Sequence, residues 1–254
     1  MNVKSTVVFA LSCLTALPVT AWDCNHKADR ALNEDLAGIT KVVLDARAGD
    51  LEITGVKGAS AFKADGEACA SKEKALDEIQ LVAERKGDTL MVKVQMPENK
   101  NWNQQARLDL DIEMADDVLI DIDDSSGDAT FTGVLVGLVD DGSGDLRFDK
   151  THGKLRLEDG SGDVRIDGHR GDVSVEDGSG SVRISDLEGN VFIDEDGSGD
   201  LTMKRISGSV KVDSDGSGDI VVAEVGGDFT VDRAGSGDVR HNGVAGKVDI
   251  PSRD

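Results

Sequence analysis

Residues 141–148 read Asp-Gly-Ser-Gly-Asp-Leu-Arg-Phe, and residues 159–166 read Asp-Gly-Ser-Gly-Asp-Val-Arg-Ile. The phrase Ser-Gly-Asp inside these stretches occurs six times between residues 126 and 238, and a seventh copy in the same register reads Ser-Gly-Ser. Successive copies lie 17, 18, 18, 19, 19 and 19 residues apart. A period of about 20 residues is typical of a solenoid, in which each repeat forms one coil that stacks on the last. The copies end at Asp128, Asp145, Asp163, Ser181, Asp200, Asp219 and Asp238.

Each period contains two short runs in which apolar and polar residues alternate. Residues 164–166 read Val-Arg-Ile, and residues 173–175 read Val-Ser-Val after a turn with Gly168 and Gly171. Alternation with period two predicts strands with one buried face. The sequence therefore predicts an all-β parallel β-helix or β-solenoid of about seven two-strand coils of 17–19 residues. We expect these residues to face inward: Leu146, Phe148, Leu155, Leu157, Val164, Ile166, Val173, Val175, Val182, Ile184, Val191, Ile193, Leu201, Met203, Val210, Val212, Val239, Val248 and Ile250.

The chain divides into three predicted regions. Residues 1–21 have a basic start at Lys4, an apolar run from Val7 to Leu17 and the small-residue ending Val19-Thr20-Ala21. This pattern predicts a secretory signal peptide, because the apolar run is too short to span a bilayer. An irregular β-rich region is expected over residues 22–117, and the regular solenoid over residues 118–254. No transmembrane segment is predicted, and the protein is expected in the periplasm or outside the cell.

The N-terminal β-rich region resembles a degenerate first coil with an excursion. Residues 39–46 and 51–53 predict strands, and residues 59–64 resemble the second strand of a coil. The excursion then predicts a helical turn over residues 71–78 and a hairpin of residues 79–83 and 89–96 around Lys86-Gly87-Asp88. A polar loop with Trp102 is expected over residues 97–105, and the alternation of residues 108–114 predicts a half-buried strand.

Two cysteines remain after the predicted signal peptide, which contains Cys13. In an oxidising compartment, Cys24 and Cys69 are expected to form a disulfide that closes a loop of about 45 residues and contributes ~3–4 kcal/mol. A zinc site that uses His26 is the alternative. Two cysteines and one histidine fall short of the ligand count and spacing of zinc sites.

The composition is strongly acidic and poor in aromatic residues. The chain has 50 Asp and Glu against 28 Lys and Arg, a formal net charge of −22, and no tyrosine. Such a surface repels nucleic acids and offers few rings on which bases could stack. Nucleic acid is therefore excluded as a partner, and proteins or glycans at the cell envelope remain.

The Gly-Ser-Gly-Asp-Val repeat, the two-strand coils and the alternating N-terminal strands resemble the bacterial putative-adhesin family of unknown function, over residues 39–250. The resemblance implies a parallel β-helix-like fold on an exported protein, with no catalytic residues to transfer. One departure is that family turns often have Thr or Ser before Gly-Ser-Gly. This chain has aspartate there, at Asp141, Asp159, Asp177, Asp196 and Asp215.

The additional aspartates suggest calcium as a ligand. Calcium favours several oxygen ligands, and two corners carry three aspartates each, although their spacing does not match an EF-hand. In the alternative interpretation these aspartates accept turn amides and keep the solenoid soluble. Apart from calcium, no cofactor is predicted. The candidate metal ligands are Asp194, Asp196, Asp200, Asp213, Asp215 and Asp219.

An enzyme that acts on polysaccharides is a further alternative. Such an enzyme needs a unique set of residues, whereas the acids and arginines recur from coil to coil, and His152, His169 and His241 are expected to be solvated turn residues. The sequence therefore favours a non-enzymatic, exported solenoid with a binding or structural role. The C-terminal coils are expected to present less charge outward, through Thr202, Lys211, Val221, Val222 and Thr230. Pro251 and the tail Arg253-Asp254 are expected to protect the open edge.

Overall fold

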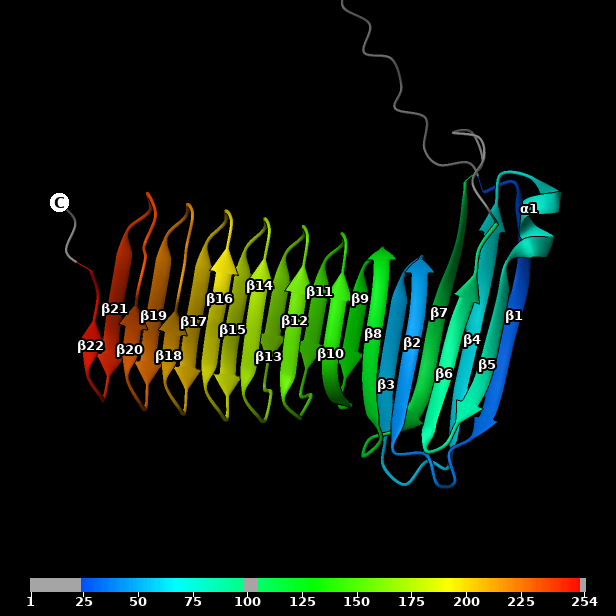
Figure 1. Ribbon diagram of the computed structural model, residues 1–254, viewed down its shortest axis with the longest axis horizontal. Coiled ribbons are helices and arrows are strands. Elements are labelled where there is room, and N and C mark those ends of the chain that lie inside the picture. Colours follow the sequence, from blue (N-terminus) through cyan, green and yellow to red (C-terminus); the bar gives the residue numbers. More distant parts are fainter. Residues whose placement is uncertain (1–23, 98–104, 252–254) are drawn as a thin grey trace, which may run out of the picture.

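The computed structural model describes residues 24–97 and 105–251 and forms one elongated rod of stacked strands (Figure 1). Two eleven-stranded sheets face each other along the rod, and their inward side chains form a continuous apolar core. The predicted β-solenoid is confirmed. Among the residues described, no helix is long and apolar enough to cross a membrane.

The order of strands along the rod differs from their order in the chain only near the N-terminus. The first sheet runs β1 (His26–Asp35), β4 (Ala61–Ala70), β7 (Ala106–Ala115), β3 (Leu51–Val56), β9 (Ala129–Thr132), β11 (Leu146–Asp149), β13 (Val164–Asp167), β15 (Val182–Leu187), β17 (Leu201–Ile206), β19 (Ile220–Val225), β21 (Val239–Val244). The second runs β5 (Gln80–Lys86), β6 (Thr89–Gln95), β2 (Lys41–Ala48), β8 (Leu119–Ser126), β10 (Leu135–Asp141), β12 (Leu155–Asp159), β14 (Val173–Asp177), β16 (Val191–Asp196), β18 (Val210–Val212), β20 (Phe229–Val231), β22 (Val248–Asp249).

Each regular coil contributes one strand to each sheet, and consecutive coils pair in parallel. Leu146 pairs with Val164, and Val164 with Val182, so equivalent side chains stack in columns about 4.8 Å apart. The rings of Phe131 and Phe148 stack in this way, with centroids 4.6 Å apart. The predicted inward residues up to Val212 are buried. Val239, Val248 and Ile250 are only half-buried, because among the described residues no further coil covers them.

The outward side chains of the C-terminal coils follow the expected pattern with one exception. Thr202, Lys211, Val221 and Thr230 lie on the outer faces and are half-exposed. Val222 was expected outside as well, but this prediction is wrong: it alternates with Val221 along β19 and is 1% exposed.

The N-terminal region closes one end of the rod by a route that the sequence did not predict. Strands β6 and β7 pair in parallel with β2 and β3, so a later part of the chain stacks outside an earlier coil. Residues 59–64 were expected to form the second strand of that coil. Instead β4 lies antiparallel between β1 and β7 in the first sheet, and strand β1 was not predicted. The hairpin β5–β6, the helix α1 (Glu73–Glu78) and the alternating strand β7 are confirmed.

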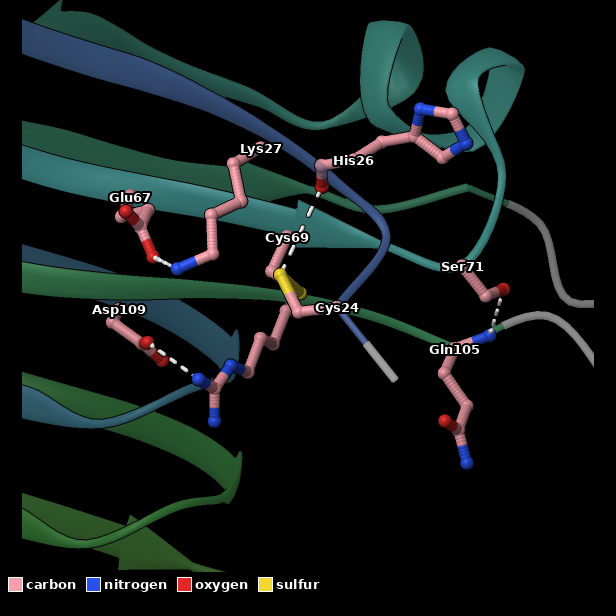
Figure 2. Close-up of a disulfide and its surroundings, with 9 residues drawn as sticks. Cys24, His26, Lys27, Glu67, Cys69, Ser71, Gln105 and Asp109 are labelled. Carbon is pink, nitrogen blue, oxygen red and sulfur yellow. Dashed lines mark hydrogen bonds and ion pairs between the residues drawn. A yellow bond between two sulfur atoms is a disulfide. The ribbon is translucent and has the colours of Figure 1, made fainter. Parts of the chain in front are cut away.

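The predicted disulfide joins the outer strands of this cap. Cys24 and Cys69 are bonded with their Cα atoms 5.5 Å apart, which ties the start of β1 to the end of β4 (Figure 2). Close by, the ammonium group of Lys27 contacts the Glu67 carboxylate at 2.5 Å, and the backbone N–H of Gln105 donates to the Ser71 hydroxyl at 3.2 Å (Figure 2). The alternative zinc site is thereby excluded for Cys24 and Cys69.

The corners stack so closely that the glycine of Ser-Gly-Asp leaves no room for a side chain. At Gly162 the backbone has φ +144°, and a Cβ atom would lie 1.8 Å from the carbonyl oxygen of Gly144 in the preceding coil. Gly144 and Gly180 are in the same situation with respect to their own neighbours. The repeated phrase is therefore a geometric requirement of the stack. The predicted signal peptide, Trp102 and Arg253-Asp254 lie outside the described residues.

Candidate functional site

The aspartates of five Ser-Gly-Asp corners each fasten one coil to the next. The Asp128 carboxylate accepts a hydrogen bond from the backbone N–H of Asp145 at 2.9 Å, and Asp145 accepts one from Asp163 at 3.0 Å. Such bonds form two runs, from Asp109 through Asp50 to Ser181, and from Asp200 to Asp238. The aspartates of this column therefore accept backbone amides of the adjacent corner.

The opposite turn carries a second set of such bonds, which the sequence analysis missed. Carboxylate, amide and hydroxyl oxygens at equivalent positions accept the backbone N–H of the next coil at 2.7–3.0 Å. The signal was a polar residue just after the glycine of that turn in successive coils. The acceptors are Asp172, Asn190, Ser209 and Asp228, and the last donor is Lys247.

The aspartates that precede the corners form a different, buried column. All but one are the last inward residues of their strands in the second sheet, and register pairs each with its equivalent in the next coil. The exception is Asp215, which lies just beyond β18 and pairs with Asp196 through an isolated bridge. Asp124 extends the column by one coil beyond the positions noted in the sequence. In the last corner Ala234 takes the place of the aspartate. The exposed fractions are 4% for Asp124, 2% for Asp141, 6% for Asp159, 2% for Asp177, 1% for Asp196 and 4% for Asp215.

Most oxygens of this buried aspartate column have no hydrogen-bond partner. The backbone N–H of Ser125 donates to Asp124 at 2.8 Å, and that of Ser161 donates to Asp159 at 3.1 Å. Ten of the twelve carboxyl oxygens are buried and unpartnered, including both oxygens of Asp141 and of Asp177. The amides of Gly142 and Ser143 lie near Asp141 without making a hydrogen bond of normal geometry.

Burial raises the pKa of five aspartates of the column. Loss of hydration is the main cause that raises the pKa of Asp124 to about 7, of Asp141 to about 6 and of Asp159 to about 7. It also raises the pKa of Asp177, and that of Asp196 to about 8. By contrast, the Ser181 amide, with help from the Arg183 guanidinium, lowers the pKa of the exposed Asp163.

A shallow acidic groove of about 510 Å³ lies over part of this column. Its lining consists of acidic side chains and glycines, with Asp141, Asp159 and Asp177 of the buried column among them. The outward acids beside them stack in register from coil to coil. The groove thus has a wholly acidic set of titratable groups. These outward residues are Asp140, Glu158, Glu176 and Glu195.

The six predicted calcium ligands are distributed over three places. Asp196 and Asp215 belong to the buried column, and Asp200 and Asp219 to the exposed corner column. Asp194 is exposed and accepts a hydrogen bond from the Ser174 hydroxyl, and Asp213 pairs with Lys211. Among the described residues, no three His, Cys, Asp or Glu side chains are grouped to hold a metal ion. Calcium binding at these aspartates therefore stays a prediction.

His169 differs from its expected place. It was predicted as a solvated turn residue but is fully buried, at the inward position that Leu187 and Ile206 occupy in the next coils. Its Nδ1 lies 2.9 Å from the Thr151 hydroxyl and its Nε2 lies 3.0 Å from the Gly153 carbonyl oxygen. Burial lowers the pKa of His169, so the ring is neutral at pH 7. The histidine supports packing, while His152 is half-exposed and His241 exposed.

The outer face of the second sheet carries a column whose residue type changes at every coil. Leu138, Arg156, Ser174, Phe192, Lys211 and Thr230 stack in register, and we call this column the variable stripe. Phe192 is 40% exposed and Leu138 38%. Of the five phenylalanines described, the other four are fully buried. Among the described residues, the one exposed phenylalanine ring, that of Phe192, therefore lies on the variable stripe.

Comparisons with known proteins place the fold. No family model and no curated protein matches the chain. A solved putative adhesin from Bacteroides fragilis matches 89% of this chain and 98% of its own, with a TM-score of 0.53 and 16% identity. The fold is shared. A putative lipid binding protein from Parabacteroides distasonis has a TM-score of 0.48, 15% identity and coverage of 90% and 98%. A putative cell adhesion protein from Clostridium sporogenes has a TM-score of 0.33 and 14% identity, and the match covers 89% of this chain and 99% of that protein.

At these identities the likeness shows the fold alone. The resemblance drawn from the Ser-Gly-Asp repeat is confirmed at that level, because the matched Bacteroides fragilis protein is a putative adhesin. The function of this chain must be argued from its own surfaces.

Proposed function

We propose that this protein is an exported, non-enzymatic β-solenoid of the putative-adhesin type that binds a protein or glycan at the cell envelope. The variable stripe carries the proposal. The core and both turns repeat the same chemistry to build the rod, whereas the stripe differs at each coil. Its exposed Phe192 lies between Ser174 and Lys211, and exposed aromatic residues beside polar ones are common in binding surfaces.

Two features support an exported location. The first 21 residues have the pattern of a secretory signal peptide, and disulfides persist mainly in oxidising compartments. The Cys24–Cys69 bond fits such a compartment.

The experiment that tests the proposal compares binding by two variants. The mature chain, residues 22–254, is applied to a glycan array and to isolated envelope protein fractions, together with Phe192→Ser and Val82→Ser. Val82 is 36% exposed on β5, in the same sheet but outside the stripe, so it is a matched control. We expect Phe192→Ser to weaken binding about tenfold or more, and Val82→Ser to bind like the parent.

Two results would contradict the proposal. Equal binding by Phe192→Ser and the parent would show that the stripe is not the contact surface. Turnover of acidic polysaccharides by the parent would instead establish the enzyme alternative, which requires a set of residues that departs from the repeat.

A further inference from the structure

Ionisation of the buried aspartate column would be energetically unfavourable. Its six carboxyl groups follow one another coil by coil at about 4.8 Å, each is at least 94% buried, and most of their oxygens are unpartnered. Ionised carboxylates so arranged would repel one another and would lose their hydration without compensation. A carboxylic acid, unlike a carboxylate, has an O–H group that can donate to a neighbouring carboxyl oxygen.

We propose that the buried aspartate column is a proton-binding site, in which carboxylic acids donate hydrogen bonds to carboxyl oxygens of the adjacent coil and so join the coils along this corner. The geometry supplies the partners. Asp159 lies in register between Asp141 and Asp177, and its side chain is close enough to that of Asp177 for a hydrogen bond once one of them carries a proton. Each protonation forms one O–H bond on a carboxyl oxygen with a proton taken from water, and ionisation breaks that bond and returns the proton to water.

The acidic groups around the column favour bound protons, and Arg47, which is in register with Asp124, is paired with Asp45 at 2.6 Å. On the same strands the outward neighbours are Asp123, Asp140, Glu158, Glu176 and Glu195, and from the corner Asp128 and Asp163 add negative charge. The described lining of the groove includes no Lys, Arg or His. The guanidinium of Arg156 on the outer face is already paired with Glu158 at 2.8 Å.

The direction of the pH dependence follows from these carboxyls. The pKa values of Asp124 and Asp159 are about 7 in the folded protein, against about 3.9 for an unfolded aspartate. Between these values the folded chain holds more protons than the unfolded chain, so its stability falls as the pH rises. The column stabilises the rod fully below about pH 4, and this contribution is lost as the pH passes through about 7 and above.

The test compares the thermal unfolding of the parent, Asp159→Asn and Glu52→Gln between about pH 6 and pH 9. In Asp159→Asn the amide can donate at every pH, and the remaining oxygen can keep its bond to the backbone N–H of Ser161. Glu52→Gln removes a carboxylate from an exposed position on β3, in the first sheet, outside the column and the groove. We expect the Tm of the parent and of Glu52→Gln to fall by about 5 °C or more, and that of Asp159→Asn to fall clearly less.

A second measurement needs no variant. Infrared spectra of the parent at neutral pH should show the carbonyl stretch of protonated carboxylic acids, which should disappear above about pH 9. A parent whose Tm is independent of pH, or a neutral spectrum without this band, would overturn the proposal. So would stabilisation by calcium at about pH 8 that chelator reverses and Asp159→Asn abolishes, because the carboxylates would then be cation ligands.

Discussion

Single residues in the corner determine how closely the coils stack. The Cβ that alanine would add at Gly162 overlaps the Gly144 carbonyl oxygen, and that oxygen belongs to a backbone fixed by its own neighbours. Gly162→Ala therefore cannot be accommodated by a side-chain movement. We expect it to destabilise the protein by about 4 kcal/mol or more, or to prevent folding, as measured by urea unfolding.

Substitution of Gly168 tests the cost of backbone strain without the cost of crowding. Gly168 also has a positive φ, of +70°, but the atom nearest to its added Cβ would be a Lys150 side-chain carbon at 3.4 Å. Gly168→Ala should therefore cost only about 1–2 kcal/mol for the left-handed conformation. If both variants lost the same stability, close stacking would not be the reason for the Ser-Gly-Asp phrase.

What the sequence could reveal about individual residues depended on the repeat. The alternation placed Val164 and Ile166 inside, and the extra aspartates were recognised because they recur before each corner. Their burial was not predicted, since an aspartate after an alternating strand is ordinarily assigned to a solvated turn. His169 was misplaced for a related reason. Only a comparison with Leu187 in the next coil shows that its position faces the core.

At the scale of strands, the disulfide holds the outermost element of the first sheet. Within residues 24–97 and 105–251, strand β1 pairs along one edge, with β4, and its residues are half-buried at most. Replacing both Cys24 and Cys69 by serine removes a constraint worth about 3–4 kcal/mol for a loop of this length. We expect amide hydrogen exchange to quicken in β1 and β4 and to stay unchanged in β13, because a solenoid opens locally. Uniform acceleration along the rod would contradict this local effect.

The cap also shows where prediction from sequence reaches its limit. Hairpin β5–β6 was predicted because its turn and both strands are adjacent in the chain. The stacking of β6 and β7 outside β2 and β3 was not, because alternation states which side of a strand is buried and does not name its partner. The same holds for β4, whose pattern fits a parallel coil as well as the antiparallel pairing that is found.

For the whole molecule, each coil contacts chiefly the coils before and after it. The coil of β17 and β18 lies between two others whose inward residues in the first sheet are aliphatic, with Val182 and Ile184 on one side and Ile220 and Val222 on the other. Its turn bonds repeat those of its neighbours, and its corner residue Asp200 accepts the backbone N–H of Asp219. A rod built in this way has stability that is approximately a sum over coils and their contacts.

Deletion of residues 201–219 tests this directly. The cut joins Asp200 to Ile220 and brings β15 beside β19 in the register that β17 now has with each. We expect a folded protein that is shorter by about 4.8 Å in solution scattering and unfolds cooperatively with lower stability. Deletion of residues 201–209 is the control, since it removes β17 and the turn that follows it and leaves the following residues out of phase with both sheets. If the whole-coil deletion failed to fold while its control folded, stability would depend on particular coils and not on their repetition.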